Sequence, residues 1–86
     1  MAEEQKIGVV EKFFSKIGVA AIRLTEGSLR VGDRIRIRGH TTDLEATIDS
    51  MQMEHVSVEK ADPGASIGVK IPGRVREHDV VYKLVP

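Results

Sequence analysis

The stretch that decides the fold is residues 27–39, which read Gly-Ser-Leu-Arg-Val-Gly-Asp-Arg-Ile-Arg-Ile-Arg-Gly. A glycine-bounded turn leads into residues 34–38, where arginine and isoleucine alternate without a break. Successive side chains of a strand point to opposite faces, so the three arginines share one face and the two isoleucines share the other. This period of two predicts a strand with one wet face and one buried face.

The same period recurs along most of the chain. The segment Ala61-Asp62-Pro63-Gly64 is a strong turn, because proline presets φ and glycine accepts a positive φ beside it. Two alanines leave residues 17–25 open to a helical interpretation, and residues 54–60 fit either one helical turn or an irregular strand. The pattern predicts strands over residues 6–14, 17–25, 33–38, 43–53, 65–71 and 79–85.

Six short strands without a long segment of period 3.6 predict an all-β domain. A small closed six-stranded antiparallel β-barrel over residues 6–86 is expected, because closure leaves no free sheet edges. Residues 1–5 are expected to form a flexible tail. The first two strands are apolar on both faces, so one face is left to pack on a partner or a chain terminus. The predicted interior consists of Ile35, Ile37, Leu44, Ala46, Ile48, Ile67, Val69, Ile71, Val80, Tyr82 and Leu84.

The composition of the chain excludes several classes of function. Thirteen lysines and arginines balance thirteen acidic residues among 86 residues, so binding to nucleic acid or an anionic membrane would depend on a local patch. The absence of cysteine excludes disulfides and thiolate metal sites. The amino end shows no basic-then-apolar leader, and no apolar run approaches the ~20 residues that span a bilayer. A cytoplasmic chain with no membrane partner is therefore expected.

Two basic groups are candidates for binding RNA or another partner. The first is Arg34, Arg36 and Arg38, whose ~6.6–7 Å spacing along one face is comparable with that of phosphates on a single strand. The competing interpretation is an ion-paired face, since carboxylates of the following strand also point outward. A hairpin that places Arg38 opposite Glu45 would place Arg34 opposite Asp49.

The second basic group is Lys70, Arg74 and Arg76, in and beside a loop that follows Pro72-Gly73. Loops carry function more often than strands do. The chain has only one tyrosine and two phenylalanines, too few for the base stacking that single-strand binders use. Contacts to phosphate, and not sequence-specific contacts to bases, are therefore the expected mode of binding RNA.

Catalysis and metal binding are not expected. His40, His55 and His78 have no metal-ligand spacing, and the serines lie in no nucleophile elbow. Side chains fill a small barrel and leave no substrate pocket inside it. The sequence therefore predicts no catalytic residue, no metal site and no cofactor, although barrels that bind flavin share the general shape.

Three stretches together are similar to domain two of the translational GTPases, the barrel that follows the nucleotide-binding domain in elongation factor Tu and elongation factor G. They are residues 27–39, residues 61–73 and Asp79-Val80-Val81-Tyr82-Lys83-Leu84. The resemblance covers residues 7–85 and implies a closed six-stranded barrel. Barrels of this type also look like the small carboxyl-terminal domain of some collagenase-like peptidases that act on or near RNA.

The chain departs from that family in two places. It lacks the G-x-x-x-x-G-K-[ST] loop that cradles phosphates, so no GTP binding by this chain alone is expected. Where elongation factor Tu carries Gly-Arg-Gly-Thr, near the docking site of the aminoacyl end of tRNA, this chain has Lys16-Ile17-Gly18-Val19.

Two functional hypotheses follow. The leading one is a non-catalytic, translation-factor-like module that contacts tRNA, ribosomal RNA or a ribosome-associated factor through the two basic groups. The alternative is a protein–protein adaptor or accessory subunit that docks on a larger enzyme or GTPase through apolar surface, with Phe14 or Phe13 exposed at the contact.

Overall fold

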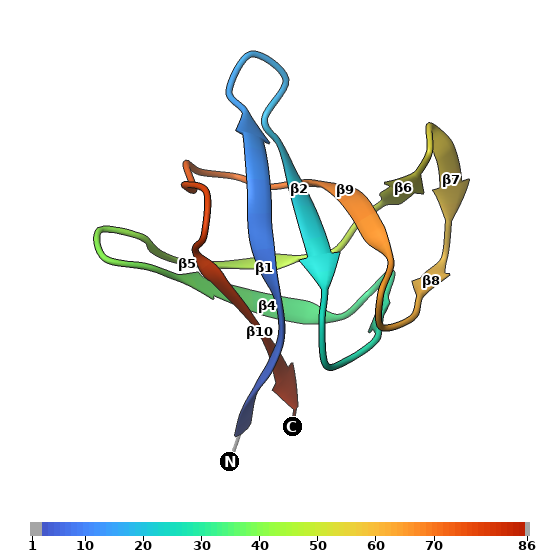
Figure 1. Ribbon diagram of the computed structural model, residues 1–86, viewed down its shortest axis with the longest axis horizontal. Coiled ribbons are helices and arrows are strands. Elements are labelled where there is room, and N and C mark those ends of the chain that lie inside the picture. Colours follow the sequence, from blue (N-terminus) through green and yellow to red (C-terminus); the bar gives the residue numbers. More distant parts are fainter. Residues whose placement is uncertain (1–2, 86) are drawn as a thin grey trace.

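The computed structural model describes residues 3–85, and this part of the chain contains strands and no helix (Figure 1). The strands are β1 (Glu3–Phe14), β2 (Val19–Leu24), β3 (Leu29–Arg30), β4 (Arg34–Arg38), β5 (Asp43–Thr47), β6 (Met51–Met53), β7 (Val56–Val58), β8 (Lys60–Ala61), β9 (Ser66–Lys70) and β10 (Val80–Val85). The prediction of an all-β chain is confirmed.

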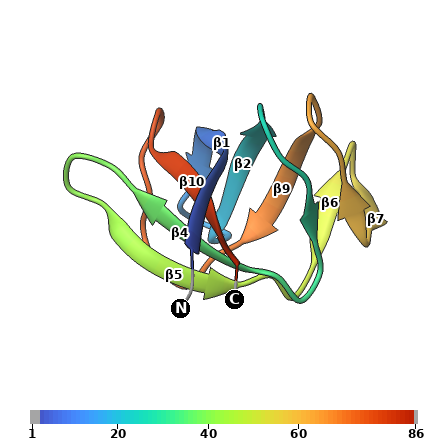
Figure 2. The ribbon, with the colours of Figure 1, turned by 90° about the horizontal axis from the view of Figure 1, so that it is seen from below.

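Eight strands form one antiparallel sheet in the order β5-β4-β10-β1-β2-β9-β6-β7, and β3 pairs with β8 in a second, two-stranded sheet. The large sheet curls around the core (Figure 2). Within the described residues no ladder joins its two edges, β5 and β7, so the expected closed six-stranded barrel is wrong. An open antiparallel sheet that is strongly curled takes its place.

The break in the expected strand over residues 43–53 explains why the ladder does not close. Ile48, the residue after β5, still bonds to the segment before β4: its N–H donates to the carbonyl of Asp33 at 2.8 Å, and its carbonyl accepts the N–H of Gly32 at 2.7 Å. Asp49 and Ser50 are exposed, and Met51 then starts β6, which pairs with β9. The chain therefore changes its neighbouring strand between β5 and β6, and the two sheet edges remain unjoined.

Strand β1 lies near the middle of the sheet and is irregular on both sides. Its register with β10 shifts between Lys6 and Gly8, and its register with β2 shifts between Val10 and Lys12. These bulges put Ile7 and Val10 into the core although they are three residues apart. Gly8 permits the close approach of β2, because a Cβ atom there would overlap the carbonyl oxygen of Arg23.

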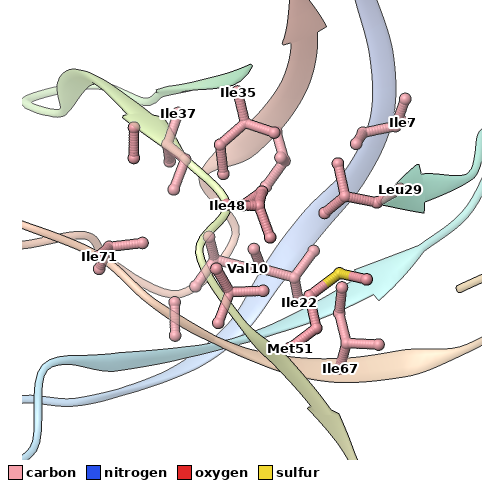
Figure 3. Close-up of a cluster of buried hydrophobic side chains, with 14 of the residues drawn as sticks. Ile7, Val10, Ile22, Leu29, Ile35, Ile37, Ile48, Met51, Ile67 and Ile71 are labelled. Carbon is pink, nitrogen blue, oxygen red and sulfur yellow. The ribbon is translucent and has the colours of Figure 1, made fainter. Parts of the chain in front are cut away.

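The core lies inside the curl of the sheet. On one side of the core lie Ile35, Ile37 and Ile48. They face Val10 and Ile22 on the opposite side, as Figure 3 shows. Of the predicted interior, seven residues are buried and Leu44 packs against them half-buried. The buried seven are Ile35, Ile37, Ala46, Ile48, Ile67, Val69 and Ile71.

The last strand has the opposite phase from the one expected. Val81 is fully buried, whereas Val80, Tyr82 and Leu84 are only half-buried. Both faces of this strand carry apolar residues, so the alternation alone does not show which face points into the core. The ladder with β4, in which Val81 lies opposite Ile37, sets it.

Two further segments differ from expectation. Residues 3–5 are not part of a flexible tail but belong to β1, where Glu3 pairs with Val85 and Gln5 with Lys83; residues 1–2 of the expected tail lie outside the described residues. Residues 54–60 form neither a helical turn nor one strand: Glu54 and His55, both at positive φ, make the tight turn between β6 and β7.

Candidate functional site

The arginine face of β4 is an ion-paired surface. Arg36 donates from Nε and Nη2 to the two carboxylate oxygens of Asp43 at 2.8 and 3.0 Å. Glu4 of β1 bridges Arg36 and Arg38, with oxygen–nitrogen distances of 3.4 and 3.3 Å. Arg34 lies 3.5 Å from Glu45. The interpretation of this face as a set of ion pairs is confirmed.

The partners of these arginines differ from the predicted ones. Arg36, not Arg38, lies opposite Glu45, and Arg38 lies opposite Asp43. The hairpin is therefore two residues tighter than expected. Glu4 could not be foreseen as a partner, because β10 lies between β4 and β1 and only the folded sheet brings Glu4 within reach.

The Arg36–Asp43 pair shifts the titration of both groups. The side-chain hydrogen bond to Arg36 lowers the pKa of the Asp43 carboxyl below its ordinary value. The same hydrogen bond raises the pKa of the Arg36 guanidinium. Both ionised forms are favoured when the two groups face each other.

The second basic group is divided by the fold. Lys70, at the end of β9, lines a hollow with Asp49 and Ser50. Arg74 and Arg76 lie in the β9–β10 connection and line a different groove. The structure therefore brings Arg74 and Arg76 together and places Lys70 apart from them.

The groove of Arg74 and Arg76, here called the loop groove, has a volume of about 800 Å³. It lies where the β9–β10 connection passes between the β1–β2 and β4–β5 hairpins, which both ribbon views show (Figures 1 and 2). Its lining consists of Phe13, Ser15, Thr41, Thr42, Arg74, Val75, Arg76 and Glu77.

Backbone hydrogen bonds fix the loop that carries these arginines. The N–H of Arg76 donates to Oδ2 of buried Asp79 at 2.8 Å, and the N–H of Asp79 donates to the carbonyl of Arg76 at 3.2 Å. The N–H of His78 donates to the carbonyl of Val10 at 2.8 Å. Gly39 leaves room for the Asp79 carboxylate, which a Cβ atom at residue 39 would overlap.

A second groove, here called the sheet groove, crosses the outer face of β2, β9 and β6. Its volume is about 400 Å³, and its lining is mostly apolar: Phe14, Ile17, Val19, Ala21, Gln52, Glu54, His55, Ser66, Ile67 and Gly68. Phe14 and Ile17 project from the β1–β2 hairpin with 42% and 62% of their surface exposed. Lys12 Nζ lies 5.2 Å from the centre of the Phe14 ring, close enough for a cation–π contact.

The sheet groove is only partly predictable from the sequence. Phe14 is the exposed phenylalanine, and Phe13 is half-buried beside the loop groove. The sequence predicts a strand over residues 17–25, yet Ile17 lies in the turn before β2. The available signal was an isoleucine directly before Gly18, which adopts the positive φ of a turn.

Within residues 3–85, no group of three or more histidine or acidic side chains is arranged to hold a metal ion. The same residues include no helix that is long and apolar enough to cross a membrane.

Comparison with known proteins shows which domain family the chain belongs to. Residues 18–81 match the family model of elongation factor Tu domain 2, so the chain belongs to that domain family. A solved structure with the same fold is the C-terminal domain of a Geobacillus thermoleovorans protein assigned to the U32 peptidases. The TM-score is 0.85 at 17% identity, over 92% of this chain and 91% of that one.

Two relatives with higher identity carry the names of proteases. An uncharacterized protease of Methanocaldococcus jannaschii is 45% identical over 80 residues, which are 92% of this chain and 19% of the relative. A collagenase of Porphyromonas gingivalis is 36% identical over 85 residues, which are 95% of this chain and 20% of the relative. The chain thus spans about a fifth of the length of these relatives.

These relatives overturn the leading functional hypothesis. The chain belongs to the family of elongation factor Tu domain 2, but the two relatives described above are named as a protease and a collagenase. The prediction of a translation module that contacts tRNA, ribosomal RNA or a ribosome-associated factor is therefore wrong. The error came from transferring the function of the fold family to this chain, since one fold serves many functions. The relatives agree better with the alternative hypothesis, a protein–protein adaptor or accessory subunit that docks on a larger enzyme or GTPase.

Proposed function

We propose that this chain is a non-catalytic accessory domain of a U32-type peptidase, and that it packs on the catalytic portion of that enzyme through the sheet groove. The observation that carries the proposal is the exposure of Phe14 and Ile17 over a groove with a mostly apolar lining. The rest of each relative is about four times as long as the matched segment, so it offers a large surface as the partner.

The shape and chemistry of the sheet groove suit a protein surface. Ala21 of β2 and Gly68 of β9 are paired neighbours in its lining and carry small side chains, whereas Phe14 and Ile17 are large and exposed. Burying an apolar side chain of this size contributes about 1.5–3 kcal/mol. Exposed aromatic side chains beside a hollow are typical anchors of protein interfaces. The expected occupant is an apolar surface segment of the catalytic portion.

The relatives' names also suggest the reaction that this domain serves, the hydrolysis of polypeptides. In our proposal the residues that cleave the peptide bond belong to the catalytic portion, and this domain contributes binding and position. Purified alone, the chain should not hydrolyse casein or gelatin.

A binding assay tests the proposal directly. The chain and the U32-type catalytic portion encoded by the same genome are produced as separate polypeptides and mixed, and binding is measured by calorimetry. Phe14→Asp should weaken the complex by about 30-fold or more, because a charge would be desolvated at an apolar contact. Binding by the unmodified chain should change little with salt, since the contact is apolar.

Val31→Asp is the matched control. Val31 has the same exposed fraction as Phe14, 42%, but lies outside the sheet groove. Absence of any complex, or equal weakening by Phe14→Asp and Val31→Asp, contradicts docking through this groove. Hydrolysis by the chain alone would contradict its non-catalytic role.

A further inference from the structure

The loop groove is separate from the proposed docking surface and has a different chemistry. Arg74 and Arg76 supply guanidinium groups, and Ser15, Thr41 and Thr42 supply hydroxyls. Within residues 3–85 neither arginine forms an ion pair, whereas all three arginines of β4 do. Two cationic side chains therefore border this groove with their donors available.

The backbone that presents these arginines is held in place before any ligand arrives. Asp79 accepts the N–H of Arg76, and His78 donates to Val10 of the central strand β1. Less ordering is therefore required on binding than in a loose loop, which favours affinity. These hydrogen bonds fix the backbone at Arg76 and His78, and Val75, which lies between the two arginines, is buried.

The groove also has an apolar side. Val75, between the two arginines, is buried with 4% of its surface exposed, and half-buried Phe13 lies on the β1–β2 hairpin. A ligand that fits both features carries an anionic group next to an apolar group. A free inorganic anion would use the arginines and leave the apolar side uncovered.

The position of Glu77 favours a peptide with a terminal carboxylate over a nucleic acid as the ligand. Its carboxylate lines the same groove and would repel the successive phosphates of a nucleic acid. A peptide presents one terminal carboxylate, and its backbone N–H groups are donors that a glutamate can accept. Planar guanidinium groups match the two oxygens of a carboxylate in a bidentate geometry.

From these observations we infer that the loop groove binds the carboxyl-terminal end of a polypeptide. Arg74 and Arg76 hold the terminal carboxylate, and the Phe13–Val75 side receives the last apolar side chain. Glu77 accepts a backbone N–H of the peptide. The inference is independent of the docking proposal, because it uses other residues and a ligand that is not the catalytic portion.

The test is a titration of the ¹⁵N-labelled chain with two hexapeptide mixtures. Both have random sequence and an apolar last residue; one ends in a free carboxylate and the other in an amide. The free-carboxylate mixture should shift the backbone signals of residues 74–77 and bind about tenfold or more tightly than the amide mixture, because hydrogen bonds to charged groups are the strong ones. Arg74→Gln combined with Arg76→Gln should lose this preference.

Arg23→Gln is the control, since Arg23 is an exposed arginine of β2 outside the loop groove. It should bind both mixtures as the unmodified chain does, and the spectra report whether each variant is folded. Equal affinity for the two mixtures overturns the inference, as does the absence of shifts at residues 74–77. Displacement of the peptides by an equal concentration of inorganic phosphate would also overturn it, because the site would then be a simple anion site.

Discussion

Two groups of arginines in this chain, those of β4 and those of the β9–β10 connection, differ in what surrounds their charges. On β4, carboxylates of Glu4, Asp43 and Glu45 already neutralise the guanidinium groups. In the β9–β10 connection, Arg74 and Arg76 border a groove and have no ion-pair partner among the described residues. The β4 arginines are the more closely spaced group in the sequence, yet they are less available to a ligand in the fold. The reason is that acidic residues on neighbouring strands already pair with them.

The two regions also differ in what holds them. The β4 arginines lie on a regular strand whose other face is part of the core, while the backbone at Arg76 is held by one hydrogen bond to the buried carboxylate of Asp79. One mutation in the core beneath β4 and another at Asp79 measure how much each contributes to stability.

The largest effect is expected where β4 meets the core. Ile37→Ala should lower the free energy of unfolding by about 2–5 kcal/mol, because Ile37 is fully buried and a cavity would remain. In a domain of this size each kcal/mol shifts the melting temperature by about 4–8 °C. Denaturant unfolding monitored by circular dichroism measures the change.

Arg38→Gln, on the opposite face of the same strand, is the matched control. Its ion pair is exposed, so a loss of about 0–1 kcal/mol is expected. If Arg38→Gln were as destabilising as Ile37→Ala, the arginine face would be a structural support, and the contrast between the two faces of β4 would fail.

An intermediate effect is expected where the loop is held. Asp79→Ala should cost about 1–3 kcal/mol, because the partly buried N–H of Arg76 loses its acceptor. Hydrogen exchange at that N–H should accelerate more than exchange at the β4 amides. Asp79→Asn keeps one side-chain oxygen acceptor and should cost less. Unchanged exchange at Arg76 in Asp79→Ala would show that Asp79 does not hold the loop.

The smallest effect is expected from the pH dependence of the β4 ion pairs. The pKa of Asp43 is lowered in the folded state by its hydrogen bond to Arg36. Its contribution to stability is therefore present above the ordinary carboxyl pKa of about 3.9 and is lost as the pH falls through the lower, folded-state value.

Unfolding by urea from about pH 6 to about pH 2 measures this dependence. The unmodified chain should lose stability more steeply below about pH 4 than Asp43→Asn, in which the group cannot titrate. Asp49→Asn is the control, because Asp49 has no ion pair among residues 3–85. Parallel pH curves for the chain and Asp43→Asn would contradict the shift.

The sequence is enough to predict most of the basic residues of the candidate site. It is not enough to predict which of them border the same groove. The alternation at residues 34–38 predicted an arginine face with acidic neighbours, and such a face is present. The sequence also singled out Arg74 and Arg76, yet grouped Lys70 with them. Strand β9 ends at Lys70, and the chain then turns away, so Lys70 and the two arginines border different hollows.

What the sequence by itself determined was the strand character of the chain and its membership in a domain family, because both depend on local periodicity and on turn residues in fixed order. Tertiary structure decided the open edge between β5 and β7, the phase of β10 and the bulges of β1. It also decided that Glu4 neutralises two arginines more than thirty positions away. These features depend on which strands become neighbours in the sheet. A strand with apolar residues on both faces, or a charge on the outer face of the sheet, fits more than one neighbour until the whole core is packed.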